Sequence, residues 1–167
     1  ACLPSGSARI TALAGLVASG LLLPNGESRL KQGLAFLATE LERTVLVDGG
    51  FITRSPTDLV SVFRDLMTLT AMFEAVKEPV AEAVTRALDR IVPALMALTH
   101  GDQRLAQFNG AVADGPPLMS GLGEHYVSMA PLDNGAHTGF QRLQRGALLV
   151  IADAGPPPAG ALSRRHH

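Results

Sequence analysis

The chain has 167 residues, a formal net charge of −1, 47% hydrophobic residues and 17% charged residues. Its length suits one domain, its hydrophobic content excludes an intrinsically disordered chain, and its balanced charge excludes the strongly basic surface of a dedicated nucleic-acid-binding protein. The single cysteine, Cys2, excludes an internal disulfide bond and a zinc site built on several thiolates. Soluble domains average about 25% charged residues. The lower value here indicates that something normally covers part of the surface.

The first predicted element is a helix from Ser7 to about Leu22, where apolar residues recur at helical spacing before the stop signal Pro24-Asn25-Gly26. Residues 10–26 carry no charge and resemble a short membrane span or the apolar part of a signal peptide. The stretch contains polar residues and lies at the lower length limit for spanning. We therefore interpret it as a helix buried in protein.

Three further helices are predicted in residues 27–102. The second follows the apolar stripe from Leu30 to Val45 and ends at residues 48–50, where two glycines accept the geometry that closes a helix. The third begins at Ser55-Pro56, because Ser caps free amides and Pro suits a first turn. The fourth opens at Glu78-Pro79, closes at residues 100–102 and contains Pro93, where we expect a kink. The short connections favour antiparallel helical hairpins.

Beyond Asp102 the predicted elements are short. Residues 104–109 are expected to be extended, residues 110–134 read as a long loop, and two strands, 140–144 and 147–152, flank a turn at Arg145-Gly146. The second strand is apolar on both faces, so it needs cover from both sides and indicates a larger sheet. The predicted organisation is a helical part at 1–102, a loop-rich linker with a short strand at 103–138, and a β-hairpin at 139–167. The predicted fold class is mainly α.

The chain has no recognisable cofactor or metal motif. Phosphate-binding loops and a nucleophile elbow are missing, and no two histidines lie at metal-ligand spacing beside a carboxylate. Polar residues gather in three clusters, at 48–56, 100–110 and 139–143. A helix C-cap followed by an N-cap explains every residue of the first cluster except Arg54, for which a structural role and a binding role are equally favoured. A capped turn is also favoured for the second cluster. The candidate binding residues are Arg54, Asp102, Gln107, Asn109, Gln141 and Arg142.

The same clusters carry a resemblance to a known family. The segments LERTVLVDGGFITRSP (41–56), HGDQRLAQFNG (100–110) and TGFQRLQRGALLVIADAGPPP (138–158) resemble consecutive blocks of bacterial heparinase II/III-like proteins. That resemblance implies the end of an α/α toroid followed by the start of a β-sandwich. It also implies β-elimination of uronate-containing glycans, with Arg54 or Asn109 stabilising charge on the uronate carboxylate.

This chain departs from the family pattern at several positions. Phe51 stands where a His is usual, Phe140 where a Tyr is usual and Gln103 where a Gly is usual, while related lyases often carry a Glu near Thr53. Phenylalanine cannot transfer a proton, so the residues for general acid and base catalysis stay unassigned. Family members also continue beyond the proline-rich turn. We therefore expect a truncated form with little activity of its own.

The main hypothesis is a fragment of a polysaccharide lyase whose parent binds an acidic polysaccharide and needs no cofactor or metal. The alternative is a non-catalytic helical module that binds a partner protein or a second copy through exposed apolar faces. A glycan-binding remnant is disfavoured, because the chain has no Trp and a single Tyr, Tyr126, for stacking on sugars. No nucleic-acid partner and no membrane span are expected. The sequence leaves the location open between cytoplasm and periplasm.

Overall fold

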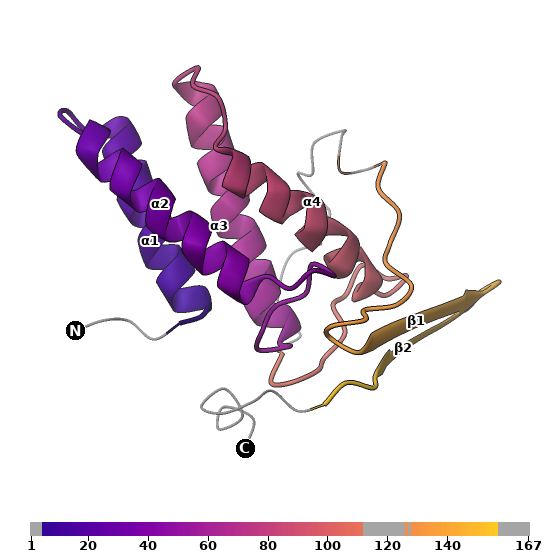
Figure 1. Cartoon of the computed structure of the whole chain (residues 1–167). Coiled ribbons are helices and arrows are strands. Elements are labelled where there is room, and N and C mark those ends of the chain that lie inside the picture. The colour runs from indigo at the N-terminus through magenta and orange to yellow at the C-terminus, as the bar shows by residue number, and fades with distance from the viewer. Residues whose placement is uncertain (1–4, 112–125, 127, 157–167) are drawn as a thin grey trace.

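The computed structural model describes residues 5–111, 126 and 128–156. Within these residues the chain forms α1 (Ser7–Leu22), α2 (Glu27–Thr44), α3 (Pro56–Ala75) and α4 (Glu82–Ala97), followed by β1 (Phe140–Arg145) and β2 (Leu148–Asp153). Figure 1 shows the helices side by side, with the β-hairpin projecting from one end of the helical layer. The predicted fold class, helical hairpins followed by a short antiparallel β-hairpin, is confirmed.

The helices pack around a shared apolar core. α1 lies against α2 and α3, while α4 lies against α3 and α2. The most deeply buried side chains come from the predicted apolar stripes, and burial of each stabilises the fold by roughly 1.5–3 kcal/mol. They include Ile10, Val17, Leu37, Leu41, Leu59, Leu66, Leu88, Ile91 and Leu95.

Several element boundaries differ from the predicted ones for local reasons. α1 has the predicted bounds, and α3 begins at the predicted Pro56, although the Ser55 side chain makes no capping hydrogen bond. α2 ends at Thr44, before the glycines, because Val45 pairs with Phe51 in an isolated β-bridge. α4 begins at Glu82 rather than at the predicted proline, after an extended Ala81.

The β-hairpin has a register one residue away from the predicted turn. Arg145 pairs with Leu148, so the two loop residues are Gly146 and Ala147. Gly146 has a φ of 59°, a left-handed conformation that glycine adopts without steric cost. In the preceding stretch expected to be extended, Leu105 forms a single β-bridge with Thr99. Most of the predicted long loop, at 112–125 and 127, and the tail at 157–167 lie outside the described residues.

The interpretation of α1 as a helix packed in protein agrees with the structure, since Ile10 and Val17 are fully buried. No helix in the described part of the chain is both long enough and apolar enough to cross a membrane.

Glycine sets how closely α1 and α2 approach. A Cβ atom on Gly20 would lie 2.7 Å from the Leu30 Cα, and one on Gly33 would lie 3.0 Å from the Val17 Cγ2. The first of these contacts involves backbone, which cannot rotate away. The tight packing of the two helices therefore requires the absence of a side chain at Gly20.

A buried carboxylate joins the start of α1 to α2. Glu40, 2% exposed, accepts hydrogen bonds from the Ser5 hydroxyl at 2.7 Å and from the Gly6 amide at 3.1 Å, and it pairs with Arg43 and Arg9. Burial alone opposes ionisation of Glu40, but the hydrogen bonds and the Arg43 charge outweigh it and hold the pKa of Glu40 below its ordinary value.

Substitution of Gly20 by Ala should destabilise the protein by about 1–3 kcal/mol, because the new methyl group overpacks the helix contact. The matched control is Gly15→Ala in the same helix, where a Cβ atom meets nothing within 4 Å. This control should gain up to about 1 kcal/mol from helix propensity. Urea unfolding followed by circular dichroism measures both values. Equal effects at the two positions would contradict the packing argument.

Replacing Glu40 by Gln should cost about 1–3 kcal/mol at pH 7, where the carboxylate is ionised and fully bonded. Because the folded-state pKa is lowered, this contribution is present above the unfolded pKa of about 4.3 and is lost as the pH falls through the folded-state pKa. Urea unfolding at pH 7, 5 and 3 should show the difference between the two proteins shrinking at the lowest pH. The exposed Glu42, replaced by Gln, serves as control and should change stability by less than about 1 kcal/mol.

Candidate functional site

The candidate site lies where the β-hairpin meets the helices, and its centre is the buried side chain of Arg54. Its Nε donates to the Thr138 carbonyl at 2.7 Å, Nη1 donates to the Pro156 carbonyl, and Nη2 pairs with the Asp153 carboxylate. The Asn109 amide donates at 3.0 Å to both the Arg54 carbonyl and the Asp153 carboxylate. We call these five residues the polar joint.

Aromatic rings cover one side of the polar joint. The Arg54 Cζ lies 5.5 Å from the centroid of the Phe140 ring, and Phe108 stacks on Phe140 with ring centroids 5.5 Å apart. Burial lowers the pKa of Arg54, yet guanidinium stays charged in proteins. The residue also has a φ of 55°, an uncommon left-handed conformation that aims its side chain from the α2–α3 connection toward the hairpin.

Asp48 holds the chain just before β1. One of its carboxylate oxygens accepts from the backbone amides of His137 at 2.8 Å and Thr138 at 2.7 Å, and from the Thr138 hydroxyl at 3.0 Å. The other accepts from the Gly50 amide at 3.2 Å. Asp48 therefore fixes both the α2–α3 connection and the approach to the hairpin.

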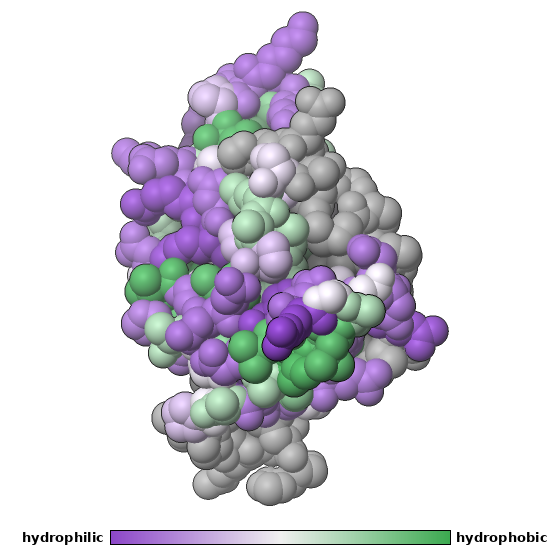
Figure 2. Space-filling view, turned by 90° about the vertical axis from the view of Figure 1, so that its right-hand side faces the viewer, coloured by the Kyte–Doolittle hydropathy of each residue, from purple (hydrophilic) through white to green (hydrophobic). Residues whose placement is uncertain are grey.

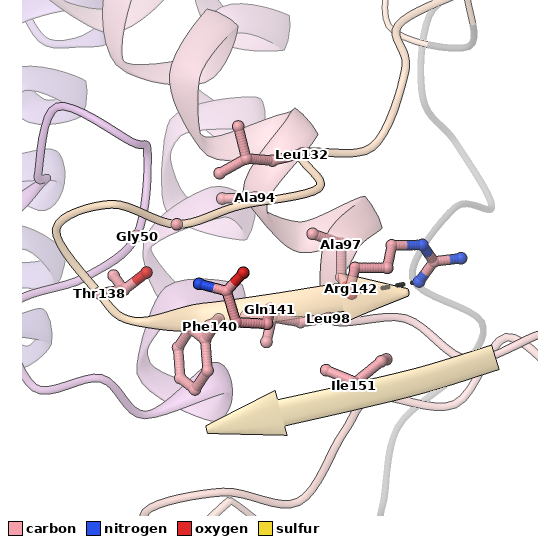
Figure 3. Close-up of a pocket in the computed structure, with 11 residues that line it drawn as sticks. Gly50, Ala94, Ala97, Leu98, Leu132, Thr138, Phe140, Gln141, Arg142 and Ile151 are labelled. Atoms are coloured by element: carbon pink, nitrogen blue, oxygen red, sulfur yellow. Dashed lines mark hydrogen bonds between the residues drawn. The ribbon is translucent and has the colours of Figure 1, made fainter. Parts of the chain in front are cut away.

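Arg142 ties β1 to the end of α4. Its Nη1 donates to the carbonyls of Ala97 at 3.1 Å, Thr99 at 2.8 Å and Met96 at 3.3 Å, and Figure 3 shows the side chain beside Ala97. The last carbonyls of a helix lack partners within the helix and carry partial negative charge. The Arg142 guanidinium donates hydrogen bonds to these carbonyls, and its positive charge balances their partial negative charge.

A small apolar pocket lies between α4 and the hairpin, and Figure 3 shows its lining. Its volume is about 10 Å³, the space of a single water molecule. Ligand pockets in proteins usually enclose about 300–1,000 Å³. A sugar ring therefore does not fit into this pocket.

The structure separates the six candidate binding residues into three places. Arg54 and Asn109 meet in the polar joint. On the hairpin, Gln141 donates to the Asn134 side chain at 2.8 Å, while Arg142 reaches α4. Asp102 lies in an exposed turn where it accepts from the Arg104 amide at 3.0 Å, and Gln107 is exposed. Their role as substrate ligands stays a prediction.

The sequence analysis missed two acidic residues that complete this region. Asp48 falls in the predicted helix-ending turn at 48–50, and Asp153 directly follows the predicted strand 147–152, so neither was among the candidate binding residues. The Arg54–Asp153 pair joins residues 99 positions apart, which no local pattern reports. The available signal was one unexplained Arg in a turn and one acid after an apolar strand.

The outward face of the hairpin is apolar. Cross-strand partners share a face, so Leu143 and Val150 lie together beside Leu148, and their exposed fractions are 67%, 43% and 66% respectively. Figure 2 looks at the side from which the hairpin projects and shows hydrophobic residues gathered there among hydrophilic ones. Exposed apolar clusters of this kind mark interaction surfaces. We call these three residues the apolar face.

Asp153→Asn should destabilise the hairpin, because it leaves the buried Arg54 charge without its anionic partner. We expect a loss of about 3 kcal/mol, the lower end for a broken buried ion pair, since the Asp153 side chain stays 20% exposed. The control Asp102→Asn removes an exposed partner of Arg104 and should cost less than about 1 kcal/mol. Urea unfolding gives both values, and hydrogen exchange in β1 and β2 should accelerate in the first variant alone.

Comparison with known proteins gives one informative match. The chain is 37% identical over 152 residues to "FtsZ-localized protein C" of Caulobacter vibrioides (strain NA1000 / CB15N), an alignment that covers 90% of this chain. It covers 26% of that relative, so the chain spans about a quarter of the relative's length. No family model matches the chain. No solved structure matches it either.

The predicted membership of the heparinase II/III-like family is therefore wrong, and so is the lyase function derived from it, because the match is to an FtsZ-localized protein. The expected acidic polysaccharide partner loses its basis with them. The three segments behind the resemblance meet at the polar joint, where Arg54 and Asn109 bond to the protein's own carbonyl and carboxylate oxygens. In this chain these polar residues anchor the hairpin.

Proposed function

We propose that this chain is a non-catalytic protein-interaction module that acts in a bacterial cell-division assembly containing FtsZ. The observation that carries the proposal is the 37% identity to the FtsZ-localized relative over 90% of this chain. The chain spans about a quarter of that relative. We therefore include in the proposal both that the chain has the relative's location and that it has the relative's partner.

The described surface supports binding to a protein. The polar groups of Arg54, Asn109 and Arg142 bond within the chain, whereas the apolar face is exposed on a projecting hairpin. The pocket beside the hairpin has room for one water molecule. A protruding apolar surface on a fixed base suits recognition of another polypeptide.

The proposed organisation follows from this arrangement. Residues 1–102 supply a helical base, residues 103–138 connect it to the hairpin, and the hairpin presents the apolar face. The polar joint and Arg142 keep the hairpin at a fixed angle to the base. A fixed angle lowers the entropy lost when a partner binds.

The experiment is fluorescence microscopy in Caulobacter vibrioides, with the chain fused to one fluorescent protein and FtsZ fused to another. We expect the chain to gather where FtsZ gathers and to disperse within one cell cycle after depletion of FtsZ. The fluorescent protein alone is the first control. The second control is Leu23→Lys, which alters an exposed apolar residue next to α1 and should leave the pattern unchanged. A diffuse signal, or a pattern that survives FtsZ depletion, would contradict the proposal.

A further inference from the structure

The two edges of the β-hairpin differ in their hydrogen bonding. On the outer edge of β1, the Arg142 amide donates to the Asp133 carbonyl at 2.9 Å and the Gly135 amide donates to the Phe140 carbonyl at 2.8 Å. Residues 133–135 thus cover part of that edge. Among the described residues, none forms a backbone hydrogen bond with the outer edge of β2.

The register identifies the backbone groups that face outward on β2. In an antiparallel pair, residues alternate between positions bonded across the ladder and positions whose amides and carbonyls point away from it. Arg142, whose backbone amide points away from the ladder, pairs with Ile151. Gln144, two residues further along β1, pairs with Leu149. Leu149 and Ile151 therefore direct their amides and carbonyls away from β1. These outward groups lie two residues apart, as a further strand would require for pairing.

The chemistry of this edge is unusual for a strand edge that no other described residue covers. Residues 148–152 read LLVIA and contain no charge and no proline. Exposed edges are normally protected by lysine, proline, bulges or covering segments. Two residues of the apolar face, Leu148 and Val150, lie on this same strand and are exposed. Within the described part of the chain, unpaired backbone and exposed apolar side chains therefore occur together on β2.

We propose that the outer edge of β2 binds an extended apolar segment of another polypeptide, which adds to the hairpin as a third strand. The inference rests on the proposed function and names the surface that performs it. The backbone groups of Leu149 and Ile151 form hydrogen bonds with the added strand. Apolar side chains of that strand pack against Val150. The exposed Arg145 lies at the tip end of the apolar face and favours an acidic group at the corresponding end of the segment.

A second copy of the chain satisfies this surface less well. If β2 paired with β2 of a second copy about a twofold axis through Val150, the paired residues would extend one continuous sheet. Leu143 and Val150 of both copies would then remain in water on its outer face. Stable interfaces also use about 20–30 residues a side, far more than one strand of six residues offers. An extended segment of a different polypeptide can pair with the edge while other parts of that polypeptide cover the apolar face.

The test uses the full chain and a synthetic hexapeptide of alternating valine and threonine that ends in glutamate, followed by amide hydrogen exchange measured by NMR. With 1 mM peptide we expect at least tenfold slower exchange at Leu149 and Ile151. The same hexapeptide with a central proline should give no protection, because proline has no amide to donate.

Two proline variants give a matched comparison on the two edges of the hairpin. Leu149→Pro removes an outward amide from β2, and Gln144→Pro removes the outward amide of its cross-strand partner on β1. Neither amide takes part in the β1–β2 ladder. We expect Leu149→Pro to abolish peptide protection at Ile151 and Gln144→Pro to preserve it. Since exchange in the unaltered chain is measured first, misfolding of a variant does not decide the outcome.

Three results would overturn the inference. One is the absence of added protection at β2 in the unaltered chain. Another is equal loss of peptide protection in both variants while the ladder amide of Val150 stays as protected as in the unaltered chain. The third is protection that rises with chain concentration without peptide, which would identify a second copy as the occupant. If the fused Leu149→Pro chain still gathers with FtsZ, the proposed function stands and the β2 edge is not its surface. If peptide binds but the chain does not gather with FtsZ, the proposed function fails alone.

Discussion

The pairing of Arg54 with Asp153 is the constraint on which the arrangement of helices and hairpin depends. A buried guanidinium is stable only when it is paired and its donors are bonded, so the loop after α2 and the end of β2 must meet. The side chain also requires the Thr138 and Pro156 carbonyls, which lie on either side of the hairpin. The Arg54 guanidinium thus holds both ends of the hairpin in place.

Two further charged residues complete the anchoring from opposite directions. Asp48 binds backbone amides ahead of β1, and Arg142 binds backbone carbonyls at the end of α4. Each ion therefore satisfies main-chain groups that would otherwise need water. Arg142 and Asp153 thus bond on the face of the hairpin that meets the helices, whereas Leu143, Leu148 and Val150 stay exposed on the opposite face.

The periodic parts of the fold were predictable, and the long-range contacts were not. Apolar spacing and the Pro24 region gave the bounds of α1, and Pro56 marked the start of α3, because both signals are local. The hairpin register shifted by one residue, since a run apolar on both faces cannot place its own turn. Within the candidate site, Arg54 was selected as unexplained. Its partner Asp153 lies 99 residues away, and the bond between them requires the folded chain.

The bonds of Arg142 to the end of α4 and of Asp153 to Arg54 attach the hairpin to the helical part at two separate places. Tension applied at the Gly146 tip passes along β1 to the guanidinium and from there to the carbonyls of Ala97 and Thr99. A second path runs along β2 through Asp153 to the loop between α2 and α3. Force applied to the hairpin would therefore be divided between the end of α4 and the α2–α3 connection, because the hairpin is attached at two points rather than at one.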